Sequence, residues 1–254
     1  MPDLFVLGLD AFNRPEMASI RGAESLDVHG LLTFDEVARP RDGELDFERM
    51  RREAEARLDA FEGSVDGIAT FWDFPSSSLA GVLRNAHGLP GPSDEAICRC
   101  EHKYWSRLLQ GEVVPEMVPE VAAIDPFAED PLAGLELSFP MWVKPIKAHS
   151  SHLGFKVRDA EELRGHLPEI RERIGIFGRP FDQYLEHVEL PERIRPVGGH
   201  WCIAEGVISA GRQCTLEGYV HRGEVVIYGA IDSIRSGRHR SCFSRYQYPS
   251  GLPH

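Results

Sequence analysis

Short apolar runs and amphipathic stretches alternate along the first ninety residues of the chain. Residues 4–9 (LFVLGL) form an apolar run, which is typical of a strand buried on both faces of a parallel sheet. The predicted elements follow in the order strand 4–9, helix near Pro15, strand 26–34, helix 46–61, strand 67–72 and helix 75–87. This βαβαβα order predicts a small parallel sheet with helices on its faces.

The stretch 46–61 has the clearest helical period. Apolar residues recur there at intervals of three or four, with charged residues between them. We therefore expect four side chains to face the core: Phe47, Met50, Ala54 and Leu58.

Glycine and proline cluster at 88–93 (GLPGPS) and mark a domain boundary. We divide the chain into residues 1–92 and 93–254. Ser93 is a helix cap, and the helix that it starts is predicted to end at Gly111. The two faces of this helix are predicted to carry Ile97, Cys100, Tyr104 and Leu108 toward the core, and Lys103 and Arg107 on the other side.

Beyond residue 130 the pattern becomes rich in strands. Residues 112–130, which contain several prolines, are predicted to be a connector with short extended pieces. The elements predicted after it are strands at 140–145 and 155–157, a helix at 160–174, a strand at 181–189 and a hairpin at 214–234 that turns at 221–223. The fold class is therefore α/β followed by α+β.

Composition and charge limit the classes of protein that fit. The chain has 254 residues, 42% hydrophobic and 27% charged, which excludes collagen-like, disordered and coiled-coil sequences. A net charge of −12 argues against binding nucleic acid through a broad basic face. No run of about 18 apolar residues and no signal segment occurs, so we expect no membrane partner. Five cysteines without a CxxC pair indicate a reducing compartment, the cytoplasm.

Familiar catalytic motifs are absent from the sequence. We find no GxGxxG after the first strand, and no GxxxxGK[ST], GxSxG or HExxH. Cys98, Cys100 and His102 lie two residues apart, a spacing that spreads them around a helix instead of onto one metal. We therefore nominate neither metal ligands nor catalytic residues.

Three segments carry candidate chemistry, each with a plain structural alternative. Lys144 lies in an apolar strand, where a buried ammonium needs an anion, but an edge strand facing water explains it equally well. Residues 147–154 (KAHSSHLG) provide amides and hydroxyls for a phosphate chain, or form an ordinary hairpin loop. Residues 182–189 (DQYLEHVE) alternate apolar and polar side chains, which fits a ribose-binding carboxylate or a solvated strand edge.

The order of these segments resembles the ATP-grasp superfamily. The matching stretches are CEHKYWSR at 100–107, FPMWVKP at 139–145, the serine-rich loop ending in LGF at 153–155, DQYLEHVE at 182–189, and QCTLEGYV followed by YGAIDSIR within 213–235. The first ninety residues are similar to the pre-ATP-grasp domain that normally precedes the superfamily's nucleotide-binding part. The resemblance implies a small parallel-sheet pre-ATP-grasp domain, followed by an incomplete ATP-grasp domain.

The resemblance also assigns roles in binding ATP. It implies that Lys103 reaches the α-phosphate, with His102 where the family has an acid, and that Lys144 bridges the α- and β-phosphates. The loop residues that it places over the β- and γ-phosphates are Ser150, Ser151, His152 and Gly154. The residues that it places at the nucleoside are Gln183 and Leu185, by backbone contacts to adenine, and Glu189, on the ribose hydroxyls.

Members of this superfamily are ligases that join a carboxylate to an amine through an acyl phosphate. The resemblance therefore implies ATP and Mg²⁺ as cofactors, with a small carboxylate and an amine as substrates. The family's metal ligands lie in strands beyond the matched region, so we expect a chain truncated before its metal-binding part. Two alternatives stay open: an inactive nucleotide-binding remnant, and a non-enzymatic α/β interaction module.

The C-terminal segment gives two further expectations. Without additional strands the hairpin 214–234 exposes an edge and a face, which predicts a poorly stable or associating C-terminal half. The basic residues Arg235, Arg245 and the run 238–240 (RHR) either attract a carboxylate or form a solvated face.

Overall fold

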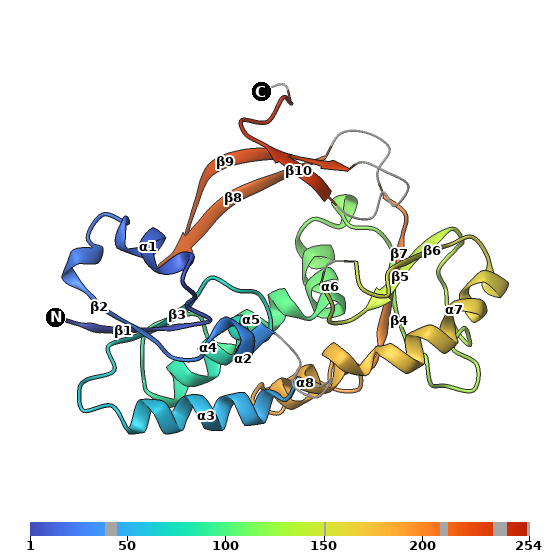
Figure 1. Ribbon diagram of the computed structural model, residues 1–254. Helices are drawn as coiled ribbons and strands as arrows, with labels where there is room; N and C mark the ends of the chain where they lie inside the picture. The colour runs from blue at the N-terminus through green and yellow to red at the C-terminus, as the bar shows by residue number, and fades with distance from the viewer. Residues whose placement is uncertain (39–44, 150, 209–212, 236–242, 253–254) are drawn as a thin grey trace.

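The computed structural model describes residues 1–38, 45–149, 151–208, 213–235 and 243–252. Within these ranges the chain forms three sheets with flanking helices (Figure 1). Two predicted features, Ser150 and the basic run 238–240, lie outside the described residues.

The N-terminal sheet is parallel, with strand order β2-β1-β3, and confirms the predicted fold of this region. Its elements are β1 (Asp3–Leu7), α1 (Asn13–Ala18), a 3₁₀ turn (Ala23–Ser25), β2 (Asp27–Gly30), α2 (Phe34–Ala38), α3 (Phe47–Asp59), β3 (Gly67–Thr70) and α4 (Ser76–Ala86). The second strand is shorter than predicted, because Phe34 already begins the short helix α2.

Helix α3 follows directly from the period of its sequence. Asp46 has an extended backbone, and its carboxylate accepts a hydrogen bond from the Arg49 amide at 2.9 Å, which satisfies one of the unpaired N–H groups of the first turn. The buried side chains are those of the predicted stripe, Phe47, Met50, Ala54 and Leu58.

The single helix predicted from Ser93 is broken at His102 into α5 (Asp94–Glu101) and α6 (Lys103–Val113). The His102 backbone is extended, and its Nδ1 accepts the Trp105 amide as an N-cap of α6. Its Nε2–H donates to a backbone carbonyl at 2.8 Å, so the buried ring is neutral, and burial lowers the pKa of His102. The break between the two helices is stabilised by the contact of His102 with the Val197 carbonyl, 95 positions later, and a local hydrophobic period cannot predict such a contact.

The break also changes which side chains of these helices face inward. Cys98 and Trp105 are buried, whereas Cys100, predicted to face the core, is exposed. The prediction for Cys100 is wrong because it assumed one continuous helix with a single apolar face. The extended backbone at residue 102 changes the direction of the chain, so α5 and α6 bury different faces.

The second sheet has antiparallel strands in the order β4-β7-β5-β6. The elements of this region are a 3₁₀ turn (Pro115–Met117), β4 (Val121–Ile124), β5 (Met141–Pro145), β6 (Phe155–Val157), α7 (Ala160–Arg173) and β7 (Cys202–Gly206). Met141 and Val143 are buried in a core with α7, so the alternating residues Trp142 and Lys144 point to the other face. Because β5 lies between two strands, the edge-strand explanation of Lys144 does not hold.

Residues 181–189, predicted as a strand, belong to helix α8 (Gly175–Leu185) and to the turn after it. The strand prediction is wrong because apolar residues recur here at intervals of three, one and three, which is a helical period. All four are buried: Phe181, Tyr184, Leu185 and Val188. The strand that completes the second sheet is β7, which the sequence pattern did not lead us to predict.

Helix α8 packs against α3 and joins the two predicted domains in one hydrophobic cluster. The ring of Phe181 meets that of Phe74 edge-on at 5.5 Å, and the ring of Tyr184 lies 5.6 Å from that of Phe47. The Tyr184 hydroxyl donates to the Asp94 carbonyl at 2.9 Å. We call the cluster of Phe47, Phe74, Phe181 and Tyr184 the shared core. The boundary at 92/93 stays a prediction, since this core crosses it.

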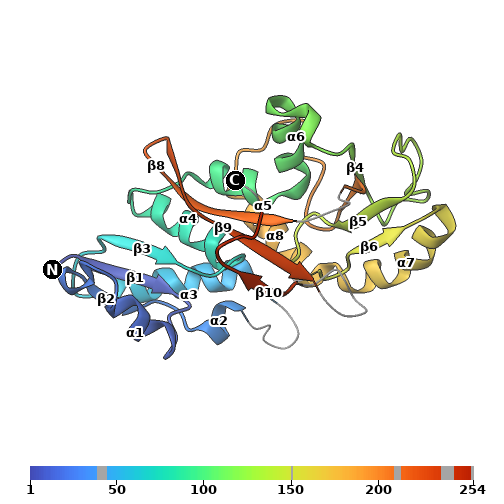
Figure 2. The ribbon, with the colours of Figure 1, turned by 90° about the horizontal axis from the view of Figure 1, so that it is seen from above.

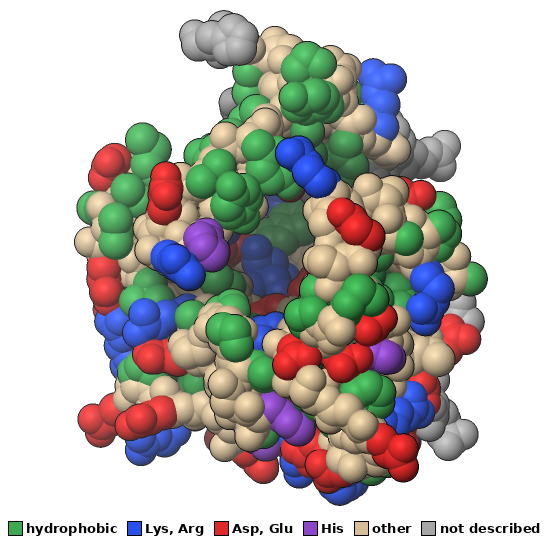
Figure 3. Space-filling view, turned by 90° about the vertical axis from the view of Figure 1, so that its left-hand side faces the viewer, with side chains coloured by type: hydrophobic (Ala, Val, Ile, Leu, Met, Phe, Trp, Pro, Cys, Tyr) green, Lys and Arg blue, Asp and Glu red, His purple; other side chains and the backbone are tan. Residues whose placement is uncertain are grey.

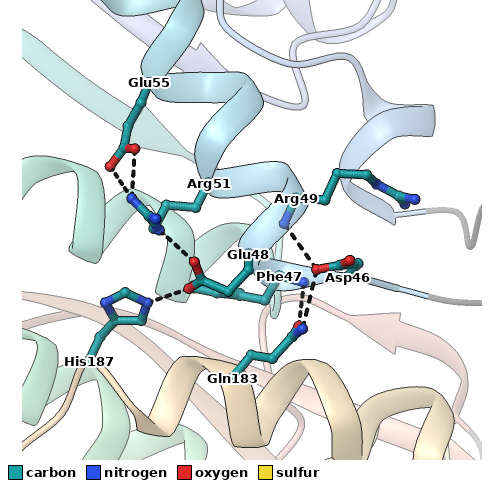
Figure 4. A network of polar contacts seen from close by, with 8 residues as sticks. All are labelled: Asp46, Phe47, Glu48, Arg49, Arg51, Glu55, Gln183 and His187. Carbon is teal, nitrogen blue, oxygen red and sulfur yellow. Dashed lines mark hydrogen bonds and ion pairs between the residues drawn. The ribbon is translucent and has the colours of Figure 1, made fainter.

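Polar contacts at the start of α3 reinforce the same junction (Figure 4). The Gln183 side chain accepts the Phe47 amide at 2.8 Å and donates to Asp46 at 3.2 Å. His187, just beyond α8, lies 2.5 Å from the Glu48 carboxylate. Gln183 therefore helps to cap a helix that lies 136 positions earlier in the chain.

The third sheet, which we call the overhanging sheet, has antiparallel order β10-β9-β8 and contains the predicted hairpin. Its strands are β8 (Cys214–His221), β9 (Glu224–Arg235) and β10 (Phe243–Gln247). Arg222 and Gly223 both have positive φ, as a two-residue type I′ turn requires. The sheet lies over the middle of the molecule (Figures 1 and 2). Its exposed apolar side chains are Leu216, Tyr219, Val220, Val225, Ile227, Tyr228 and Tyr246.

Candidate functional site

Four cationic side chains gather where α6 meets β5. Lys103 and Arg107 come from α6, Lys144 from β5, and Lys147 from the segment directly after β5. Figure 3 shows the molecule hollowed at its centre, with Lys or Arg side chains on the floor of the hollow and acidic side chains close by. In a chain of net charge −12, such a gathering of cations stands out from the rest of the sequence.

Glu205 on β7 holds two of these cations. In the β5–β7 register Glu205 faces Trp142, and Lys144 faces Ile203, so Lys144 and Glu205 are diagonal neighbours. The Lys144 ammonium pairs with one oxygen of the carboxylate, and Arg107 Nε donates to the other at 2.6 Å. Burial raises the pKa of Glu205, but the two cations lower it further, and the net direction is downward. The carboxylate is therefore ionised and only 6% exposed.

Lys103 is held by backbone carbonyls. Its ammonium donates to Ala148 at 2.7 Å and to Ile146 at 3.3 Å, and within the described residues no carboxylate forms an ion pair with it. Burial and then the charges of Lys147 and Lys144 lower the pKa of Lys103 to about 7. An anion that enters here meets an ammonium that lacks a counter-ion.

Lys147 is the most buried of the four cations, with 4% of the residue exposed. Its ammonium pairs with Glu101 at the end of α5 and lies 3.5 Å from the Asp73 carboxylate, which follows β3. It also stands 5.1 Å from the centre of the Phe74 ring. Ser77 fixes the second oxygen of Glu101 by a hydrogen bond of 2.6 Å. Lys147 thus connects the carboxyl end of the N-terminal sheet to the lysine cluster.

The serine-rich loop predicted to cover phosphates lies directly after Lys147. Ser151 has φ of 59°, and the Gly154 amide donates to the Ser151 carbonyl at 3.2 Å, so the segment forms a tight turn. The His152 ring packs edge-on against Phe177 at 5.5 Å, and burial lowers the pKa of His152. The loop segment begins beside Lys103, because the Lys103 ammonium donates to the carbonyl of Ala148. The contact of the loop with phosphate stays a prediction.

Three other predicted nucleotide-binding residues lie apart from this cluster. Gln183 is bonded to the start of α3, Leu185 is buried, and Glu189 is exposed in the turn after α8. Their predicted roles at adenine and ribose assumed a strand at 181–189, whereas these residues belong to α8 and to the turn after it. The structure brings Lys103 and Lys144 together, and the roles of the other three residues at the nucleoside stay predictions.

Sequence reasoning missed Glu205 and the Glu101–Lys147 pair. Residues 201–207 (WCIAEGV) form an apolar run with a single acid, just as residues 140–145 form an apolar run with a single lysine. Such an apolar run is a signal that could have predicted β7. The pairing of Glu101 with Lys147 spans 46 positions, and no local pattern indicates it.

The described part of the chain contains neither a metal-binding cluster nor a membrane-spanning helix. No three His, Cys, Asp or Glu side chains are grouped in a way that holds a metal ion. No helix in the same residues has both the length and the apolar character needed to cross a membrane.

Solved structures with a similar fold are ligases and synthetases. No protein-family model matches the sequence, and no curated protein matches it. L-amino acid ligase from Bacillus licheniformis aligns with a TM-score of 0.59 and 18% identity, over 92% of this chain and 50% of that protein. D-alanine–D-alanine ligase from Bacillus anthracis, complexed with ATP, aligns with a TM-score of 0.59 and 12% identity, over 100% of this chain and 72% of that protein.

A third structure extends the likeness to another reaction. N5-carboxyaminoimidazole synthetase from Staphylococcus aureus, complexed with ADP, aligns with a TM-score of 0.57 and 12% identity, over 99% of this chain and 59% of that protein. The chain thus has the ATP-grasp fold that the sequence resemblance implies. It spans half the length of the first ligase and about three fifths of the synthetase.

Proposed function

We propose that the chain binds ATP at the cluster of Lys103, Lys144 and Arg107 and acts as a carboxylate–amine ligase. In this reaction a substrate carboxylate attacks the γ-phosphorus and the bond from that phosphorus to the ADP oxygen breaks. An amine nitrogen then attacks the acyl carbon, loses a proton, and phosphate leaves. Such chemistry needs positioned reactants and cations at the phosphates more than it needs a nucleophilic side chain.

The observation that carries the proposal is the charge balance of the cluster. Among the described residues, Lys144 and Arg107 share the carboxylate of Glu205, and Lys103 forms no ion pair. Lys147, by contrast, is balanced by Glu101 and Asp73. Lys103 is thus the member of the cluster without an ion-paired carboxylate among the described residues, and its ammonium gains most from a phosphate group.

The residues described here do not supply a place for Mg²⁺, although the fold family implies this ion. No cluster of three metal-binding side chains exists among them, and the acids next to the lysines are engaged in ion pairs. We therefore assign no step to a metal ligand of this part of the chain.

Calorimetric titration with ATP, with and without added Mg²⁺, tests the proposal. We expect the wild-type chain to bind ATP, and Lys103→Met and Lys144→Met to lose that binding. Lys156→Met is the matched control, because Lys156 is an exposed lysine on the neighbouring strand β6. A folded wild-type chain without affinity for ATP contradicts the proposal and favours an interaction module.

A second measurement separates the ligase from an inactive remnant. Phosphate release is measured with ATP and pairs of L- and D-amino acids, a substrate class that we infer from the ligases of similar fold. Turnover with at least one pair is expected of the ligase, whereas binding of ATP without turnover by any pair supports the remnant.

A further inference from the structure

Lys103 and Lys147 are tied together by a reciprocal set of contacts. The Lys103 ammonium is held by the carbonyls of Ile146 and Ala148, the two neighbours of Lys147. In return, the Lys147 ammonium is held by Glu101, which lies two positions before Lys103. The Lys103 amide also donates to the Ile146 carbonyl at 3.4 Å. Each side chain thus fixes the backbone that carries the other.

The Glu101–Lys147 bridge is well placed to keep this arrangement rigid. Glu101 is about as buried as its partner, with side-chain exposures of 11% and 4% for Glu101 and Lys147. The Ser77 hydroxyl and the Asp73 carboxylate occupy the remaining sides of the pair. Rotation of either side chain away from the other breaks a buried ion pair, which is strongly unfavourable.

From these contacts we infer that Lys147 and Glu101 are positioning residues, which hold the 146–148 backbone so that its carbonyls orient the Lys103 ammonium toward the phosphate site. This inference rests on the proposed function for its role in ATP binding. The geometric part concerns the ligand-free chain and is tested independently.

Charge separates the electrostatic effect of the bridge on Lys103 from its positional effect. The groups that act on Lys103 are Lys147 and Lys144, which lower its pKa, and Glu101 and Asp73, which raise it. Removing the Lys147 charge therefore moves the pKa of Lys103 upward, and removing the Glu101 charge moves it downward. Loss of the bridge, in contrast, weakens ATP binding in both variants.

The test uses the full chain and three readouts. The titration of Lys103 is followed by the ¹³Cε shift of labelled lysine without ligand, with Lys103→Met identifying the signal. Hydrogen exchange of the 146–148 amides reports the rigidity of the segment, and calorimetry gives the Kd for ATP.

The variants are Lys147→Met, Glu101→Gln, the double variant and Lys147→Arg. Glu95→Gln is the control, because Glu95 forms an exposed ion pair with Arg99 on the same helix.

We expect the Lys103 midpoint to rise in Lys147→Met, to fall in Glu101→Gln, and to stay unchanged in Glu95→Gln. The Kd for ATP should increase about tenfold in both single variants, equivalent to about 1.4 kcal/mol, and Lys147→Arg should recover most of the affinity. The double variant leaves neither member of the buried Glu101–Lys147 pair alone, so we expect it to fold even where a single variant does not, and it should still show faster exchange at 146–148.

The outcomes separate this inference from the proposed function. Midpoints and exchange rates that do not move in the ligand-free variants overturn the positioning role, whatever the chain binds. Wild-type protein that shows the expected midpoints but binds no ATP overturns the proposed function alone. Variants in which the titration midpoint of Lys103 changes but the Kd for ATP does not overturn the claim that the orientation of the Lys103 ammonium contributes to ATP binding.

Discussion

The shared core and the overhanging sheet place similar side chains in opposite surroundings. In the shared core, Phe47 and Tyr184 come from distant segments and are fully buried. In the overhanging sheet, Tyr228 and Ile227 lie on a strand of equally apolar sequence and are 65% and 57% exposed. Apolar sequence is therefore not enough for a core, because a second element must supply the opposite surface.

The difference lies in what each region receives from elsewhere in the chain. Helix α8 brings Phe181 and Gln183 back to α3, so packing and capping act together at one junction. The strands of the overhanging sheet pair with one another, and the Ser250 hydroxyl donates to the Asp232 carboxylate at 2.5 Å within the same region of the chain. A three-stranded sheet is marginal unless one face is packed, and the weakness of the C-terminal half stays a prediction.

The largest expected effect comes from emptying the shared core. Phe181→Ala removes a buried ring between Phe74 and Tyr184 and should lower the free energy of unfolding by about 3–5 kcal/mol. Tyr228→Ala on the overhanging sheet should change it by no more than about 0.5 kcal/mol, because the side chain is exposed. Urea denaturation of both variants measures the contrast. Equal losses would show that the two regions do not differ in packing.

The next effect concerns association through the overhanging sheet. Val220 and Val225 face each other across the hairpin and are 69% and 67% exposed. Replacing both with Thr keeps the strand propensity and removes apolar surface, so we expect less self-association at high concentration by light scattering. Val113→Thr, exposed at the end of α6, is the control. A wild-type chain that stays monomeric at every concentration contradicts this prediction.

A smaller effect tests what the lysine cluster does to stability. The folded-state pKa of Lys103 is about 7, below its ordinary value of 10.5, so between these pH values the unfolded chain binds the extra proton. The unfavourable contribution is fully present below pH 7 and fades as the pH rises toward 10.5. Lys103→Met should therefore raise the Tm at pH 6, by about 2–4 °C per kcal/mol gained, and the gain should shrink by pH 10.

A Tm gain that does not depend on pH would mean that folding does not lower the pKa of Lys103.

The affinity for ATP should depend on pH in the opposite direction from stability, because the same Lys103 ammonium is involved. Phosphate favours the charged ammonium, so binding should take up protons near pH 7 and weaken above it. Calorimetry in buffers of different ionisation enthalpy measures this uptake.

The smallest effect lies on the surface of the N-terminal region. Burial raises the pKa of Glu36, but Arg57 and Thr33 bond its carboxylate and bring the pKa down to about 2. Since the ordinary value is 4.5, this stabilisation is present above pH 4.5 and is lost as the pH falls toward 2. Glu36→Gln should cost at most about 1 kcal/mol at pH 7, because Arg57 is half-exposed, and nothing at pH 2. A difference that persists at pH 2 would point to another cause.

Sequence patterns predicted those features that depend on neighbouring residues. The stripe of α3, the strand around Lys144 and the turn at Arg222 all follow from local period or turn chemistry. The order of motifs, taken with the resemblance to ATP-grasp proteins, was sufficient for the fold and for bringing Lys103 and Lys144 together.

The features that escaped prediction depend on contacts between distant residues. The break at His102 is completed by the Val197 carbonyl, and Lys147 finds Glu101 only after the chain has folded. Residues 181–189 fit both an alternating and a helical pattern, and packing against α3 selects the helix. In such cases the competing local patterns are close in energy, and tertiary contacts decide.

The junction between α3 and α8 has a consequence for synthesis of the chain. Phe47 and Phe74 leave the ribosome long before Phe181 and Tyr184, which cover them in the finished protein. At about 5–20 residues per second, the N-terminal segment waits roughly 5–20 s with an open apolar surface. We therefore expect the nascent chain to expose this apolar surface to chaperones and to other chains during that interval, and a change in translation speed to change how long it does so.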